Sequence, residues 1–216
     1  MKSDIERQVL EEIENRRGHI VEFLRKLISI PSVTGEELQV QKFITRKLTE
    51  LGLEVDLWEP NLEELKKHPA YLPPGRDYKD RPNVVGIYKG AGQGRSLLFN
   101  GHVDVIPAGP QDAWEHPPWA GEIEGTRLYG RGASDMKSGL AAMTMAIETL
   151  INLKIRLKGD VLLEYTMDEE ATGNGTLACV TRGYRADAGI CCARPLRDEP
   201  PPAPHHRLTR RQWPVE

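Results

Sequence analysis

Five side chains that could bind metal ions lie at or just beyond the ends of apolar stretches: His102, Asp104, Asp135, Glu169 and Glu170. Imidazole nitrogens and carboxylate oxygens are ligands that zinc takes in proteins. Metal ions held by such a set polarise a carbonyl group and activate a water molecule, which is the chemistry of metal-assisted hydrolysis. A site with two zinc ions needs more ligands than these, so the five residues supply part of such a set.

The run SLLFNGHVDV leads an apolar strand into His102, and Asp104 follows two residues later. At that spacing the carboxylate could accept a hydrogen bond from the ring nitrogen that the metal does not use. H-x-D alone is a weak motif, and a histidine and an aspartate in an ordinary loop also fit it. Its weight here comes from the acidic segments that follow.

Two later segments place acids beside glycine-rich turns. In LYGRGASDMKSGLAAM we expect Asp135 to open the helix that follows, with a plain helix cap as the alternative. VLLEYTMDEEATGNGT ends a strand in Asp168, Glu169 and Glu170. Their mutual repulsion would be relieved by a cation or by solvent, so a solvated acidic turn is the alternative there.

The first fifty residues predict two amphipathic helices. Apolar residues at helical spacing behind a capping box predict one long helix over 3–30, which Pro31 ends. Thr34 and Glu37 repeat the capping-box pattern before a second helix, and Gly52 is placed to terminate it.

Further along the chain, strands and helices alternate. Short β-rich runs predict strands at 53–58, 84–88, 97–99 and 161–165. Apolar residues at helical spacing predict a helix around 140–150, and the proline-rich stretch 69–82 is typical of a surface loop. This alternation favours a layered α/β domain, in which loops after the carboxyl ends of strands carry the ligands.

Composition bounds the class of protein. With 216 residues, 39% of them hydrophobic, and a net charge of −3, the chain predicts a globular domain without the basic excess that nucleic-acid binding requires. No stretch approaches the ~18 apolar residues of a membrane span, so we expect a cytoplasmic protein with no membrane partner. The three cysteines, Cys179, Cys191 and Cys192, predict reduced thiols rather than a disulfide framework.

Four segments in order, GHVDV, WEHPPW, LYGRGASDMKSGLAA and DEEATGNGT, resemble the dinuclear zinc aminoacylase and carboxypeptidase metallopeptidase superfamily. The members that look most similar are of the acetylornithine deacetylase and succinyl-diaminopimelate desuccinylase type. The resemblance implies a zinc-exopeptidase-like α/β fold with a mixed sheet flanked by helices, truncated here, of which residues 1–190 form the N-terminal part. It also implies a cis peptide bond between Asp135 and Met136.

The resemblance further implies a role for each candidate residue. His102 would bind one of two Zn²⁺ ions, Asp135 would bridge both, and Glu170 would bind the other. Glu169 would act as general base, and Asp104 would orient His102. Co²⁺ or Mn²⁺ could replace zinc, because mixed nitrogen and oxygen sites discriminate poorly among these metals.

The sequence departs from the family after the segment ADAGI. Relatives carry a metal-binding glutamate or aspartate soon after it, usually before a proline, whereas here Arg194 precedes Pro195. A guanidinium group offers only donors and cannot bind zinc. Glu199 could substitute if the loop were longer. Residues 191–216 predict an irregular tail rich in proline and arginine, which resembles an out-of-frame translation.

The family pattern also requires a later histidine on the second metal and an inserted dimerisation domain, through which relatives form homodimers. Both lie beyond this chain. His205 and His206 are candidate replacements for that histidine, although their surroundings do not match the family and solvated histidines in an irregular tail fit them better.

The resulting hypothesis is a metal-dependent amidohydrolase, impaired by truncation. Its substrate would be a small molecule, either an N-acyl amino acid that loses its acyl group or a small peptide. The rival hypothesis is a non-catalytic fragment that binds metal weakly. A third is complementation, in which another chain carrying the C-terminal half restores activity.

Overall fold

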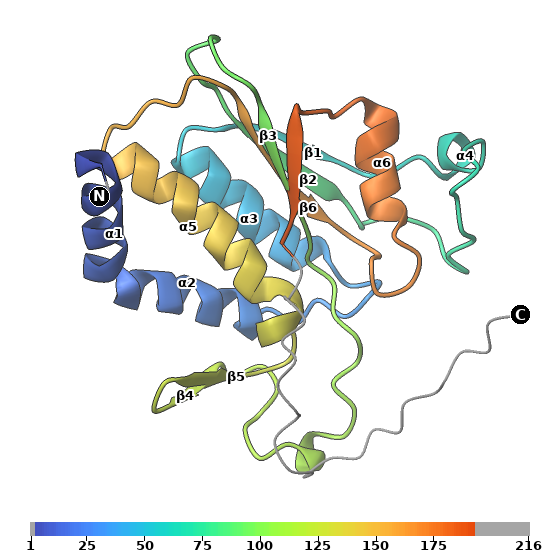
Figure 1. The fold of residues 1–216 in the computed structure, drawn as a ribbon. Coiled ribbons are helices and arrows are strands. Elements are labelled where there is room, and N and C mark those ends of the chain that lie inside the picture. The colour runs from blue at the N-terminus through green and yellow to red at the C-terminus, as the bar shows by residue number, and fades with distance from the viewer. Residues whose placement is uncertain (1–2, 193–216) are drawn as a thin grey trace, which may run out of the picture.

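A five-stranded mixed sheet organises residues 3–192, which are the residues that the structure, a computed structural model, describes (Figure 1). The strand order is β1-β2-β6-β3-β7; β2 is antiparallel to β1 and β6, whereas β3 is parallel to β6 and β7. The strands are β1 (Glu54–Trp58), β2 (Asn83–Tyr88), β3 (Leu97–His102), β6 (Val161–Thr166) and β7 (Ala188–Cys191). Four of these were predicted from the sequence, and β3 extends three residues beyond the predicted end, up to His102.

Helices cover both faces of this sheet, as the resemblance implied (Figure 1). On one face α3 packs on β1 and β2, and α5 packs on β3 and β6, with α1 (Asp4–Asn15) and α2 (Arg17–Ser29) against α5. On the opposite face α6 packs against β6. The bounds of the covering helices are α3 (Leu38–Glu50), α5 (Ser138–Asn152) and α6 (Asn174–Arg182).

The N-terminal segment forms two helices rather than the single one predicted: α1 (Asp4–Asn15) and α2 (Arg17–Ser29). The capping box is present, since the amide of Glu6 donates to Ser3 Oγ and the amide of Ser3 donates to Glu6 Oε2. The break falls at Arg16, whose φ of −99° and ψ of 10° are not helical. Gly18 weakens helix propensity there, and Arg16 turns to pair with Glu148 of α5. In Figure 1 the two helices meet at a steep angle.

The capping box predicted for α3 is wrong. Glu37 occupies the position before the helix but makes no capping hydrogen bond to it. The Thr34 hydroxyl instead donates to Asp104, and the Glu37 carboxylate binds Arg81 besides accepting from the Gly35 amide, so tertiary partners take the place of the capping contacts. The predicted end is confirmed, because Gly52 follows α3 in the left-handed region with φ of +78°.

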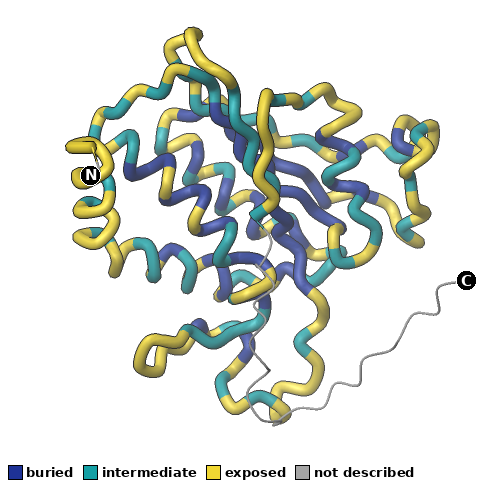
Figure 2. The backbone as a smooth tube through the Cα atoms, viewed as in Figure 1, coloured by how far each residue is buried: buried dark blue, intermediate teal, exposed yellow. Residues whose placement is uncertain are grey.

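The main core lies between the sheet and the helices on its α3 and α5 face (Figure 2). Leu48 of α3, Leu140 of α5 and Leu163 of β6 are all fully buried in it. Each such side chain stabilises the fold by about 1.5–3 kcal/mol on burial. The packing is close enough that a Cβ added at Gly101 of β3 would lie 2.7 Å from Leu140 Cδ2. A larger residue immediately before His102 would therefore displace the ends of the Leu140 and Met136 side chains.

The connections hold the remaining elements: α4 (Leu62–Leu65), η1 (Gln111–Ala113), and the hairpin of β4 (Glu122–Glu124) with β5 (Arg127–Tyr129). The loop predicted over 69–82 is not simply a surface loop, because Tyr78 and Arg81 are 3% and 2% exposed. Cys179, Cys191 and Cys192 are not paired with one another. Among the helices of residues 3–192, none is long and apolar enough to cross a membrane.

Candidate metal centre

The register of two parallel strands brings the candidate residues together. His102 of β3 lies opposite Thr166 of β6, and the amide of Val103 donates to the Thr166 carbonyl at 2.8 Å. The segments that follow the two strands therefore leave the same edge of the sheet side by side. One carries Asp104, and the other carries the acidic turn 168–170.

Asp135 reaches this edge from a separate turn, η2 (Ala133–Lys137), and not from the start of α5 as predicted. That helix begins only at Ser138, and Asp135 and Met136 have non-helical dihedral angles. The peptide bond between them is cis, as the resemblance implied. Met136 anchors the turn to β3, since its sulfur accepts a hydrogen bond from the His102 amide at 3.2 Å.

Three of the predicted ligands converge. Within the described part of the chain, His102, Asp135 and Glu170 offer ligand atoms that all lie within 4.8 Å of one another. His102 Nε2 is 3.2 Å from Asp135 Oδ1 and 3.4 Å from Glu169 Oε2. His102 is 6% exposed, whereas the side chains of Asp135 and Glu169 are 66% and 50% exposed. A buried imidazole thus faces acids that open to solvent.

The His102 ring is oriented by its other nitrogen. Nδ1 lies 2.9 Å from the backbone carbonyl of Asp104. Since a carbonyl oxygen can only accept, Nδ1 must carry a proton, so Nε2 is the nitrogen that can give up its proton and offer a lone pair to a metal. This is the tautomer that a metal ligand at Nε2 requires.

Asp104 is fully buried, and its carboxylate holds the acidic turn more directly than it holds the ring. Its two oxygens accept hydrogen bonds from the amides of Glu169 at 3.0 Å and Glu170 at 3.1 Å, and from the Thr34 hydroxyl at 2.9 Å. The nearest contact of the carboxylate with His102 is 3.6 Å, from Oδ1 to Nδ1. The predicted orienting contact therefore comes mainly from the Asp104 carbonyl.

Burial and charge shift the pKa values of three groups at this site. Burial alone lowers the pKa of His102, but the Asp104 carboxylate and the charge of Glu169 outweigh it and raise the pKa to about 9. Burial raises the pKa of Asp104, yet the nearby His102 ring and the hydrogen bond from the Glu169 amide leave that pKa below its usual value. Burial keeps the pKa of Glu170 above its usual value. The site therefore stabilises positive charge beside its acids.

Two supporting residues were not recognised from the sequence. Thr34 contacts Asp104 because residues 32–34 run beside 103–105, and the amide of Thr34 donates to the Val105 carbonyl at 3.1 Å. Lys137 is fully buried beneath the turn that carries Asp135. Its ammonium donates to the carbonyls of Leu27 and Ile30, each at 2.8 Å, and burial lowers its pKa to about 7. No local sequence pattern signals either contact.

The donor set fits a zinc ion. One imidazole nitrogen and two carboxylates from three separate segments are ligand types that zinc takes, and Glu169 is a further carboxylate beside them. The other candidates for metal binding, Glu199, His205 and His206, lie outside the described residues, as does Arg194.

Comparison with known proteins bears directly on this cluster. Residues 98–202, which contain all five candidate residues, match the model of peptidase family M20/M25/M40. Over this stretch the chain belongs to that family. The M20 match thus begins within β3, and it includes the turn of Asp135 and the acidic turn after β6.

Curated proteins similar to this chain include a deformylase and a desuccinylase. N-formyl-4-amino-5-aminomethyl-2-methylpyrimidine deformylase of Bacillus subtilis (strain 168) is 33% identical over 183 residues, which cover 82% of this chain and 39% of the relative. Succinyl-diaminopimelate desuccinylase of Buchnera aphidicola subsp. Baizongia pistaciae (strain Bp) is 32% identical, with 75% and 38% covered. The chain therefore spans well under half the length of these relatives.

Solved structures share the fold. Human carnosine dipeptidase 1 superposes with a TM-score of 0.71 at 21% identity, covering 86% of this chain and 40% of that one. The M20-family metallo-carboxypeptidase Sso-CP2 of Sulfolobus solfataricus superposes with a TM-score of 0.64 at 24% identity, covering 80% and 36%. At these identities the likeness establishes the fold alone.

Proposed function

We propose that this chain is the N-terminal part of a metal-dependent M20-family hydrolase that cleaves a linear amide bond. The observation that carries the proposal is the convergence of His102, Asp135 and Glu170 at one edge of the sheet, inside the M20 match. Relatives named deformylase and desuccinylase support an N-acylated small molecule as substrate, and N-acyl amino acids are the class we favour. A small peptide is the alternative substrate.

The proposed ligand roles are those that the family resemblance implies, and the closeness of the three side chains supports them. His102 and Glu170 would each bind one zinc ion, and Asp135, which comes from its own turn, would be shared. When bound, zinc polarises an amide carbonyl and lowers the pKa of a water molecule. The buried His102–Asp104 pair would keep the imidazole nitrogen directed at the metal.

Glu169 is the residue we propose as general base. Its carboxylate lies beside the proposed ligands, with Oε2 3.4 Å from His102 Nε2, and its side chain is half exposed. A carboxylate in this position can accept a proton from water and return it to the departing nitrogen. The amide of Glu169 is fixed by Asp104, which sets the direction in which the side chain leaves the turn.

We propose residues 1–190 as the N-terminal part of the catalytic domain and 191–216 as the irregular tail described above. The chain spans 39% and 38% of the two curated relatives. The groups that select a substrate and those that form a homodimer would lie in the remaining part of such proteins, which has no counterpart here. A cytoplasmic location remains our expectation.

A non-catalytic fragment is the second candidate. Three ligand residues converge within the described part, and three ligands suffice for one weakly held ion but not for a pair of ions. This candidate predicts at most one bound metal per chain and no turnover.

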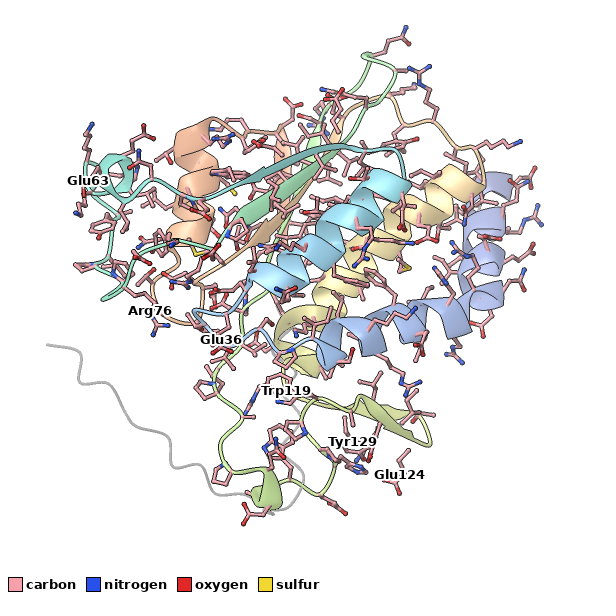
Figure 3. All side chains as sticks on the ribbon, turned by 180° about the vertical axis from the view of Figure 1, so that it is seen from behind. Glu36, Glu63, Arg76, Trp119, Glu124 and Tyr129 are labelled. Atoms are coloured by element: carbon pink, nitrogen blue, oxygen red, sulfur yellow. The ribbon has the colours of Figure 1, made fainter. Side chains whose placement is uncertain are left out.

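The test measures metal content and hydrolysis on the full 216-residue chain. Elemental analysis gives the number of zinc ions bound, and a panel of N-formyl, N-acetyl and N-succinyl amino acids and dipeptides is assayed with added Zn²⁺ or Co²⁺. We expect hydrolysis that Glu169→Gln abolishes while metal remains bound. Glu63→Gln, a change at an exposed residue of α4 (Figure 3) outside the cluster of proposed ligands, serves as the control with unchanged turnover. Metal binding without turnover in the unmutated chain would favour the non-catalytic fragment.

A further inference from the structure

A buried ion-pair network lies directly behind the acidic turn. Arg81 is 2% exposed, and its guanidinium donates to two fully buried carboxylates. Nε and Nη2 bond Glu37 at 2.9 and 2.6 Å, and Nη2 also bonds Asp168 Oδ1 at 2.8 Å. The positive charge of Arg81 thus lies between two negative charges. One is on Glu37, just before α3, and the other is on Asp168, the residue preceding Glu169.

Asp168 is the corner of the acidic turn. It has φ of +66°, a left-handed conformation that is uncommon for a residue other than glycine. Its carbonyl accepts from the amides of Thr172 at 2.9 Å and Gly173 at 2.8 Å, and its Oδ2 accepts from the Thr172 and Tyr78 hydroxyls. Both carboxylate oxygens and the carbonyl of Asp168 are therefore used to fix the direction in which the chain enters residues 169–170.

The segment that supplies Arg81 is itself fastened to the same region. The Tyr78 hydroxyl donates to Asp168 at 2.9 Å and accepts from Asn174 Nδ2 at 2.8 Å, while the guanidinium of Arg81 stacks 5.2 Å from the Tyr78 ring centroid. In the same segment, Arg76 donates to the Thr34 carbonyl at 2.7 Å. Figure 3 shows Arg76 close to Glu36, in the turn that contains Thr34. The stretch predicted to be a surface loop thus packs against the outer side of the acidic turn.

Two clamps therefore hold the pair Glu169–Glu170. Asp104 holds their amides from the β3 side. Arg81 holds Asp168, the residue before them, from the β2 side. The clamps are linked through the turn before α3, since Thr34 bonds Asp104 and Glu37 bonds Arg81.

We propose that Arg81 is a positioning residue, which sets the direction of the Glu169 and Glu170 side chains by fixing Asp168. The inference rests on the proposed function, because it assigns those two side chains to metal binding and proton transfer. Burying three charges is costly, and a buried ion pair is weak evidence for stabilisation. The role of the Arg81 ion pairs here is to fix one arrangement of the acidic turn. A planar guanidinium can bind two carboxylates at fixed angles, which a lysine ammonium cannot do.

The test exchanges Arg81 for lysine, which keeps the charge but loses the fork of donors. In metal-free protein, hydrogen–deuterium exchange is followed at residues 168–173, whose protected amides include those of Glu169, Glu170, Thr172 and Gly173. We expect exchange there to accelerate by about tenfold or more through local opening. We also expect Co²⁺ to bind about 10–100-fold more weakly, as when other supporting residues of metal ligands are lost.

Arg16→Lys is the matched control. It makes the same exchange in an ion pair with Glu148, near the far end of α5 from Asp135. Its exchange at 168–173 and its Co²⁺ affinity should equal those of the unmutated chain. If Arg81→Lys does not fold, Asp168→Asn replaces it, because that change removes the same pairing while keeping the side-chain shape.

Unchanged exchange at 168–173 in folded Arg81→Lys overturns the proposal, and so does acceleration that extends equally over the whole chain. Unchanged Co²⁺ affinity together with faster exchange also overturns it, because the turn would then move without consequence for the ligands. An unmutated chain that takes up no cobalt contradicts the proposed function. In that case the exchange experiment, which needs no metal, still decides whether Arg81 fixes the turn.

Discussion

The carboxylate oxygen Oδ1 of Asp104 lies 3.0 Å from the backbone nitrogen of Glu169, and this contact is shorter than any the carboxylate makes with the His102 ring. The aspartate of an H-x-D motif therefore acts in two ways here. Its carbonyl orients the imidazole, and its carboxylate holds the turn that carries the acids. The same carboxylate charge also keeps a proton on His102 in the metal-free site.

Asp104→Asn should lower the pKa of His102 from about 9 towards its ordinary 6.5, because the carboxylate is the main group that raises it. The asparagine side chain also places an N–H donor where the Asp104 carboxylate accepts hydrogen bonds from the acidic turn. Metal affinity should therefore fall by about 10–100-fold. NMR titration of the ring in metal-free protein measures the first effect, and calorimetry with Zn²⁺ measures the second. Asp187→Asn is the control, because the Asp187 carboxylate also accepts a hydrogen bond from a backbone amide but lies far from Asp104 in the sequence. A pKa that stays near 9 in Asp104→Asn would contradict this account.

Zinc should stabilise the folded chain by mass action. A ligand at about 100 times its Kd raises the free energy of unfolding by about 2.7 kcal/mol when it binds only the native state. We expect a higher Tm with Zn²⁺ in calorimetry, and no increase in His102→Ala. His116→Ala is the matched control, since His116 also faces carboxylates, with Nδ1 2.7 Å from Glu122, yet lies away from the cluster. An increase that persists in His102→Ala would place the zinc elsewhere, and loss of the increase in His116→Ala as well would show that the effect is not specific to the proposed site.

Much of this arrangement follows from local sequence signals. Apolar runs predicted four of the strands and α5, and their boundaries predicted that His102 and Glu169 would follow strand ends. The parallel pairing that sets His102 beside Thr166 depends on contacts between segments 64 residues apart, which no local pattern records. The sheet edge could be predicted, but the register could not.

The errors share one physical cause, which is that tertiary partners outcompeted local ones. Thr34 has the spacing of a helix cap but gives its hydroxyl to Asp104. Arg81 lies in a proline-rich polar stretch but is drawn into the interior by Glu37 and Asp168. A buried arginine between two acids cannot be told from a solvated one by composition, so the second clamp on the acidic turn became visible only in the fold.

Stability should depend on pH through Glu148. Its carboxylate faces Arg16, His19 and Lys47, with Lys47 Nζ at 2.6 Å and His19 Nε2 at 3.0 Å. Burial raises the pKa of Glu148, but Arg16 and Lys47 outweigh it, so the folded pKa lies below the usual 4.5. A lowered folded pKa means that the contribution is complete above pH 4.5 and is lost as the pH falls through the folded value.

Glu148→Gln tests this prediction. At pH 7 it should reduce the free energy of unfolding by about 1.5–3 kcal/mol, the range for hydrogen bonds to charged groups. Urea midpoints of the two proteins should converge as the pH falls below 4. Glu50→Gln, an exposed change on α3, should show neither effect. A difference between the proteins that persists at low pH would mean that packing, and not charge, explains the loss.

Gly101→Ala should destabilise the chain and disturb the metal site together. The added Cβ would lie 2.7 Å from both Leu140 Cδ2 and Met136 Cε, closer than carbon atoms pack. Overpacking of this kind costs about 1–3 kcal/mol. Because Met136 follows Asp135 and its sulfur accepts from the His102 amide, the displaced side chain should also shift the turn that carries a proposed ligand. Denaturant unfolding and Zn²⁺ calorimetry measure the two effects.

The comparison variant is Gly18→Ala, on the exposed side of α2, where an added Cβ meets nothing within 4 Å. There the replacement should stabilise by up to about 1 kcal/mol, since alanine has the higher helix propensity. It should leave zinc affinity unchanged. Opposite signs for the same chemical change would show that close packing at Gly101, and not the general preference for alanine, decides the result. If both variants gained stability, Gly101 would not be closely packed against Leu140 and Met136. The explanation that packing at Gly101 helps to hold Asp135 near His102 would then be wrong.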